Sequence, residues 1–238
     1  MQTYLFHGVI LPERAQISLN FEVGFTHLTS GDEGRAKVSI ILNQLSVTVD
    51  TKTVWDIHDL RNVVKNIIQN HLAMIGYLKG CAYDFEVTRV LNPPEKIDYV
   101  FGIDIPCLAR SRESIDLDSE LNLLKTKTAG ENGIFINRCF NDLVSAMKCA
   151  DDTAFYCYRA IESLRLHCAV VNELSDKNKK VQWEKFREVS DLNKDEIYEI
   201  TDSAKAVRHG DVSSITGEGR ADMFKKTWNI VSAYLKHI

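Results

Sequence analysis

Two side chains that together can cleave a phosphodiester bond lie next to each other near the end of the sequence. The stretch TDSAKAVRHGDVSS, residues 201–214, places Arg208 beside His209. A histidine exchanges protons near neutral pH, as general acid–base catalysis on a ribose hydroxyl requires. An arginine keeps its charge and grips a phosphate through two N–H groups, which offsets the negative charge of the transition state. One interpretation of the pair is therefore a phosphodiester-cleaving site.

The same pair also has a purely structural interpretation. The stretch 194–210 has apolar residues at helical spacing and acidic residues in its first turn, and it ends in Arg208 and His209. Cations in a last turn are favoured by the helix dipole, and Gly210 suits the left-handed residue that closes a helix. Lys205 lies four residues before His209 and shares its face. Either interpretation predicts a helix that ends at this pair.

A second pair of charged residues lies in an apolar helix predicted over residues 153–174. Arg159 and Glu162 are three residues apart and share a helical face. They form either an intrahelical ion pair or a part of the same site. In the second case Glu162 orients the imidazole of His209 and Arg159 binds phosphate.

These two segments resemble the HEPN superfamily. The resemblance rests on FYCYRAIESLRL, a spacer, and a helix that ends in AVRHG, and it covers about residues 137–238. It implies a helical bundle that cleaves RNA without a metal, at a site formed where two such helices meet across a dimer. His209 matches the family histidine, whereas the family arginine, four to six residues earlier, falls on Lys205, Ala204 or Ser203. In this sequence the positive charge of the family arginine is then supplied by Lys205 or by Arg208.

The C-terminal half is predicted to be an all-helical bundle. Its helices are expected over residues 136–150, 153–174, 181–190, 194–210 and 218–238, and the second is the most apolar. The polar stretch 109–134 has no long apolar period and is predicted to be a linker. The chain is thus divided into 1–108, 109–134 and 135–238.

The N-terminal half is predicted to be a mostly antiparallel sheet with one long helix. Residues 3–11, 16–28, 36–50, 81–92 and 97–106 are rich in β-branched and aromatic residues. Within 36–50 the apolar alternation changes phase at Asn43-Gln44, which indicates a bulge or a tight reversal. Residues 54–80 have a helical apolar stripe and end at Gly80. The fold class is therefore α+β.

Composition restricts the remaining possibilities. The sequence has no apolar run of the roughly eighteen residues that a membrane helix needs and no visible secretory signal, so we expect a cytoplasmic protein with no membrane contact. Six scattered cysteines without a C-x-x-C pair are expected to be reduced core residues, and no metal or cofactor site is predicted. The net charge is −4, and the sequence lacks the long basic face that stable nucleic-acid binding normally requires.

The sequence therefore leaves alternative functions of different classes. The first is an RNA endonuclease of the bacterial or phage conflict type, antiviral or toxin–antitoxin, which uses His209 with Arg208 or Lys205. The second is a catalytically inactive HEPN-like module that docks with itself as a homodimer or with a partner effector protein. A third is nucleotide sensing by either half.

Overall fold

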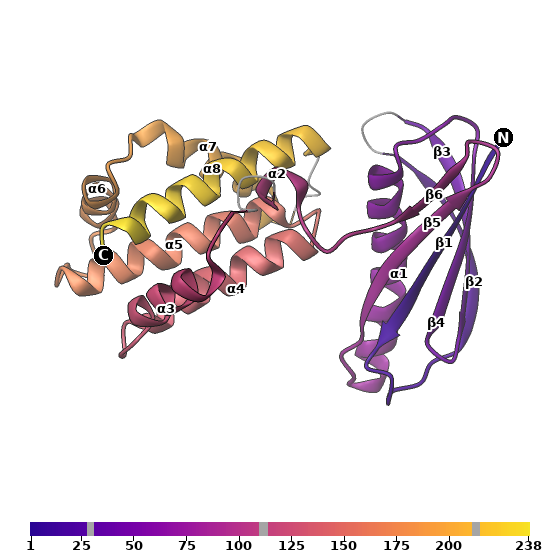
Figure 1. Cartoon of the computed structure of the whole chain (residues 1–238), viewed down its shortest axis with the longest axis horizontal. Coiled ribbons are helices and arrows are strands. Elements are labelled where there is room, and N and C mark those ends of the chain that lie inside the picture. Colours follow the sequence, from indigo (N-terminus) through magenta and orange to yellow (C-terminus); the bar gives the residue numbers. More distant parts are fainter. Residues whose placement is uncertain (28–30, 110–113, 211–214) are drawn as a thin grey trace. The chain divides into compact units, whose positions relative to one another are not determined.

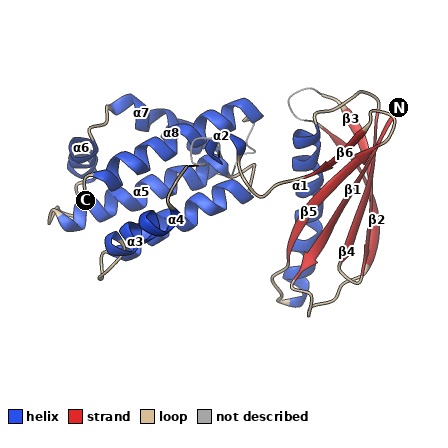
Figure 2. Ribbon diagram, viewed as in Figure 1, coloured by secondary structure: helices blue, strands red, loops and turns tan. Residues whose placement is uncertain are grey.

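The chain folds into two compact units, residues 1–103 and 104–238 (Figure 1). The structure is a computed structural model that describes residues 1–27, 31–109, 114–210 and 215–238. The first unit is an antiparallel sheet with one long helix, and the second unit is helical (Figure 2). The predicted α+β class is confirmed.

The first unit is a six-stranded antiparallel sheet in the order β2-β3-β4-β1-β5-β6. Side chains alternate along the central strands, so one face of the sheet is buried beneath α1 and the opposite face is largely polar. The strands are β1 (Gln2–Leu11), β2 (Leu19–Thr26), β3 (Glu33–Ile41), β4 (Gln44–Thr51), β5 (Asp84–Asn92) and β6 (Ile97–Val100).

Helix α1 (Ile57–Lys79) covers that buried face. The Asp56 carboxylate accepts hydrogen bonds from the backbone N–H groups of His58 and Asp59 and caps the first turn. The helix ends at Gly80 in the left-handed conformation, as its sequence predicts. The buried residues recur every four positions and form one stripe against the sheet: Leu60, Val64, Ile68 and Leu72.

The phase change in the third predicted strand is a tight reversal rather than a bulge. Ile41 pairs with Gln44, so only Leu42 and Asn43 connect β3 to β4. Both residues have positive φ angles, as a two-residue hairpin turn that matches strand twist requires. The last predicted strand is shorter than expected, because β6 ends at Val100 and Pro106 begins a short helix.

The second unit is built around α5, which packs against α4, α6, α7 and α8. Its described helices are α2 (Pro106–Ala109), α3 (Leu117–Lys127), α4 (Gly133–Lys148), α5 (Thr153–Val171), α6 (Lys179–Ser190), α7 (Lys194–Arg208) and α8 (Gly217–Lys236). Twelve of the nineteen residues of α5 are buried, in agreement with its apolar sequence.

Segment 109–134, for which the sequence predicts a linker, contains a helix in this structure. Asp116 caps α3 by accepting a hydrogen bond from the backbone N–H of Ser119. No residue of α3 is fully buried, and only Leu124 packs against the bundle core. This weak burial explains why the segment has no long apolar period. The unit boundary lies earlier than predicted, at Ile103 and Asp104.

A buried histidine joins α5 to α8. Nδ1 of His167 lies 2.6 Å from the hydroxyl oxygen of Tyr234, and both side chains are almost fully buried. Burial lowers the pKa of His167 below its ordinary value near 6.5, because a buried imidazolium loses its hydration.

Acidification is therefore expected to weaken the bundle through His167. Below pH 6.5 the unfolded chain binds a proton at this histidine that the folded chain does not, so stability falls as the pH drops through this window. The slope is at most about 1.4 kcal/mol per pH unit for one proton. Urea unfolding of wild type and His167→Gln between pH 7 and 5 measures it. A smaller pH dependence in the variant supports this account, and parallel curves contradict it.

Candidate functional site

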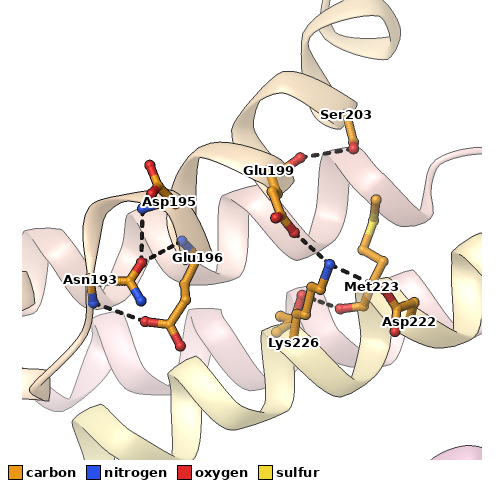
Figure 3. A network of polar contacts seen from close by, with 9 residues as sticks. Asn193, Asp195, Glu196, Glu199, Ser203, Asp222, Met223 and Lys226 are labelled. Carbon is orange, nitrogen blue, oxygen red and sulfur yellow. Dashed lines mark hydrogen bonds and ion pairs between the residues drawn. The ribbon is translucent and has the colours of Figure 1, made fainter.

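Helix α7 carries the predicted Arg208–His209 pair, and polar contacts fix its N-terminal half (Figure 3). The Asn193 carboxamide oxygen accepts hydrogen bonds from the backbone N–H groups of Asp195 and Glu196, and the Glu196 carboxylate accepts the Asn193 backbone N–H. This reciprocal capping box satisfies the free donors of the first turn. Lys226 of α8 pairs with Glu199 and holds α7 against α8. The pair thus lies on an anchored helix.

The C-terminal end of α7 agrees with the sequence prediction. Arg208 is the last helical residue, His209 is the C-cap, and Gly210 follows with a φ of 90°. The helix packs through Ile197, Ile200 and Ala204, which point to the bundle core. Three charged or titratable side chains of the last turn and cap are exposed: Lys205, Arg208 and His209. All three charged or titratable groups of the predicted motif are therefore accessible from solvent.

Arg208 is held by an aromatic ring and not by a carboxylate. Its guanidinium carbon lies 4.7 Å from the ring centroid of Tyr158 on α5, a cation–π contact. Within the described residues the side chain of Arg208 has no ion pair and no hydrogen bond. A guanidinium that stacks by its face keeps the N–H groups along its edge free to donate. The N–H groups of Arg208 are therefore available to donate to an anion.

Tyr158 is itself fixed within α5. Only 7% of its surface is exposed, and its hydroxyl donates to Glu162 Oε1 at 3.3 Å. Burial raises the pKa of Tyr158, so the phenol stays protonated and can donate this bond at neutral pH. Glu162 also accepts from Arg165 at 3.5 Å. Glu162 thus acts on Arg208 indirectly, through the ring that Arg208 covers.

Arg165, which donates to Glu162 on α5, also contacts two residues of α6. Arg165 is 2% exposed, and its guanidinium donates to the side-chain oxygen of Gln182 and lies 5.3 Å from the Trp183 ring centroid. Its Nε atom is buried and has no hydrogen-bond partner. Arg165 is therefore a structural residue that joins the two helices and holds Glu162.

Arg159 occupies a different place from either sequence interpretation. Its guanidinium donates to Asp142 Oδ1 on α4 at 2.6 Å and lies beside the rings of Phe155 and Tyr156. The predicted intrahelical pair with Glu162 is wrong, because Glu162 pairs with Arg165 instead. No contact of Arg159 with His209 occurs among the described residues. The physical reason is the almost fully buried Asp142, which requires a cation.

We expect Arg159→Met to destabilise the bundle by about 2 kcal/mol at pH 7, because it leaves the Asp142 carboxylate buried without a partner. Burial already raises the pKa of Asp142, and loss of Arg159 raises it further. Protonation at lower pH relieves the cost, so the difference from wild type should shrink at pH 5. Urea unfolding at both pH values measures it. A difference that does not depend on pH would contradict the role of Asp142.

The assembled site is a cationic helix end without a metal cluster. Among the described residues, no group of three or more His, Cys, Asp or Glu side chains could hold a metal ion. Sequence analysis missed Tyr158, although it lies four residues before Glu162 within the quoted FYCYRAIESLRL stretch. Its i, i+4 spacing could have indicated the contact with Glu162, but the contact with Arg208 depends on the packing of α7 against α5.

Comparison with known proteins assigns the chain to a family without an established function. Residues 4–101 match the N-terminal domain of DUF8168, a domain of unknown function, and residues 121–238 match its C-terminal domain. No curated protein and no solved structure matches the chain. No described helix is long and apolar enough to cross a bilayer. Since the two matches follow each other in order and together span most of the sequence, the chain belongs to the DUF8168 family.

Proposed function

We propose that the C-terminal unit is a metal-independent RNA endonuclease of the HEPN type, with His209 as general acid–base and Arg208 as the phosphate-binding residue. The observation that carries the proposal is the stacking of Arg208 on Tyr158. It holds a guanidinium beside an exposed histidine while the charge stays unpaired within the described residues.

The reaction follows from these two side chains. His209 takes the proton of a ribose 2′-hydroxyl, and the 2′-oxygen bonds to phosphorus as the bond from phosphorus to the 5′-oxygen breaks. A protonated imidazole returns the proton to the 5′-oxygen. Arg208 donates to the phosphate oxygens, where negative charge increases. The products are a 2′,3′-cyclic phosphate and a 5′-hydroxyl.

Lys205 and self-association complete the proposal. Lys205 is exposed one turn before His209, where it adds a second positive charge near the phosphate. A homodimer through the bundle would bring a second copy of the same helix end to the RNA, so that one histidine acts as base and the other as acid. The similarity to HEPN bundles stays a prediction, and the bacterial or phage conflict setting is the one that it implies.

The test is cleavage of single-stranded RNA by the purified chain in EDTA, with end-group analysis of the products. EDTA removes contaminating metal-dependent nucleases. Fragments with 2′,3′-cyclic phosphate ends support the proposal. Intact RNA at high protein concentration would overturn it.

The support of Arg208 by Tyr158 can be tested in the same assay. Tyr158→Phe keeps the ring under the guanidinium and removes only the hydroxyl, so we expect its cleavage rate to remain near wild type. Tyr158→Leu removes the ring, and we expect a loss of about fivefold, from the energy of a cation–π contact. Thermal unfolding of both variants controls for stability. Equal cleavage rates for the two variants would mean that the Tyr158 ring does not support Arg208 in cleavage.

A second candidate function is supported by the contacts of the other two predicted site residues. Arg159 forms an ion pair with Asp142. Glu162 accepts a hydrogen bond from the Tyr158 hydroxyl and forms an ion pair with Arg165, so both residues contribute to packing. A bundle used only for docking with itself or with a partner effector would need no more than this. Under that alternative the chain does not cleave RNA, and sedimentation should show a homodimer that His209→Ala leaves unchanged.

A further inference from the structure

The N-terminal unit carries a cluster of aromatic and basic side chains that the proposed cleavage does not use. His58 and Arg61 come from the first turns of α1, Tyr99 from β6, and Phe101 follows β6 directly. The three rings pack edge to face, with centroids 5.3 Å apart for Tyr99–Phe101, 5.5 Å for His58–Tyr99 and 5.7 Å for His58–Phe101. We call these four residues the α1–β6 cluster.

The α1–β6 cluster combines a buried, fixed phenylalanine ring with two exposed rings. Phe101 is 7% exposed, its ring stacks on buried Phe6, and its backbone N–H donates to Thr88 at 2.8 Å. Tyr99 is 40% exposed and His58 is exposed, so both rings are accessible to solvent although both contact Phe101. Exposed aromatic surface of this kind is available for stacking with a planar group.

Arg61 is the most unusual member of the cluster. It is half-buried, its guanidinium carbon lies 4.4 Å from the Phe101 ring centroid, and its Nε is buried without a hydrogen-bond partner. No described residue forms an ion pair or hydrogen bond with its side chain. Burial lowers the pKa of Arg61 because its charge is poorly compensated, although Tyr99 and Glu86 act in the opposite direction.

The carboxylate that precedes Tyr99 on β6 is already paired with another arginine. Arg89 on β5 forms a two-point ion pair with Asp98 on β6, at 2.7 and 2.5 Å. Asp98 precedes Tyr99 in the sequence, so the carboxylate next to the cluster already has a partner. A half-buried guanidinium without a partner costs stability, and such groups concentrate at binding sites.

We propose that the α1–β6 cluster binds a nucleotide unit, with the base stacked on Tyr99 beside the edge-on His58 ring and the phosphate held by Arg61. Exposed aromatic faces bind bases irrespective of their sequence, and a guanidinium is a preferred partner of phosphate. A planar ligand that carries a negative charge satisfies both features. The unit belongs either to a free nucleotide or to a single-stranded RNA, and the two sources are distinguished by experiment.

The experiment measures equilibrium binding to the full-length chain in EDTA. Calorimetry with ATP and with GTP tests the free nucleotides, and fluorescence anisotropy with a labelled eight-nucleotide oligouridylate tests RNA. Tyr99→Leu removes the exposed ring, and Arg61→Met removes the charge and keeps the aliphatic stem. The matched controls are Tyr77→Leu, since Tyr77 is 88% exposed at the far end of α1, and Arg14→Met, which is exposed outside the cluster.

We expect Tyr99→Leu and Arg61→Met each to weaken binding about tenfold, from the measured range for base stacking and charged contacts. The two controls should bind like wild type. Binding of ATP or GTP identifies a free nucleotide, and binding of the oligouridylate alone identifies RNA. Absence of binding by all three probes, or equal affinity of cluster variants and controls, would overturn the proposal. Every chain in the oligouridylate measurement also carries His209→Ala, so that the proposed cleavage does not consume the probe and a failed cleavage assay does not decide this result.

Discussion

Replacing His209 with alanine is expected to lower the rate of RNA cleavage by a factor of about 10² to 10⁴, the usual contribution of one general acid–base. His209 caps α7 through its backbone, whose N–H donates to the Ala206 carbonyl at 3.0 Å, and alanine keeps that bond. Within the described residues its ring makes no hydrogen bond or ion pair. The substitution therefore removes the proposed acid–base group and keeps the backbone contact of the helix end.

The chain contains a matched control for this substitution. His237 is the exposed C-cap of α8, with φ and ψ of −99° and 0°, compared with −96° and 5° for His209. His237→Ala removes an equivalent ring from an equivalent helix end, and it should cleave RNA like wild type. Equal loss in both variants would mean that the effect is structural. Unchanged cleavage in His209→Ala would assign the activity elsewhere or to a contaminant.

Replacing Arg220 with methionine is expected to destabilise the C-terminal unit by about 3 kcal/mol. Arg220 lies on α8, and its Nε donates to Thr153 Oγ1 at 2.7 Å. Its Nη2 donates to the carbonyls of Ala146 and Met147 at 3.1 and 2.9 Å, in the last turn of α4. One side chain thus satisfies the free carbonyls at the end of α4 and joins them to the start of α5.

Methionine fills much of the same space but donates no hydrogen bond, so the Met147 carbonyl loses its side-chain donor and Ala146 keeps only the hydroxyl of Thr153. Urea unfolding followed by circular dichroism at 222 nm reports mainly on this helical unit. Lys225→Met is the control, because Lys225 is exposed on the same helix. If both variants unfold at the same urea concentration, Arg220 does not hold the helices together as its contacts indicate.

Local rules explain which parts of the structure could be predicted from the sequence. The apolar stripe of α1, its end at Gly80 and the end of α7 at Gly210 depend on residues within a few positions of one another. The alternation of the strands does so as well, and these elements together imply the α+β class. Helix α3 could not be predicted in this way, because only Leu124 contributes to the core and the segment has no apolar period.

The sequence alone predicted that Arg208 and His209 lie at a helix end, since the apolar stripe and the closing glycine are local properties. Only the tertiary structure decided the partners: Arg208 with Tyr158, 50 residues away, and Arg159 with Asp142, 17 residues away. Arg61 and Phe101 likewise meet only because β6 returns beside the start of α1. Such contacts depend on how elements pack and on which buried charge needs a counter-charge, and no spacing rule contains that information.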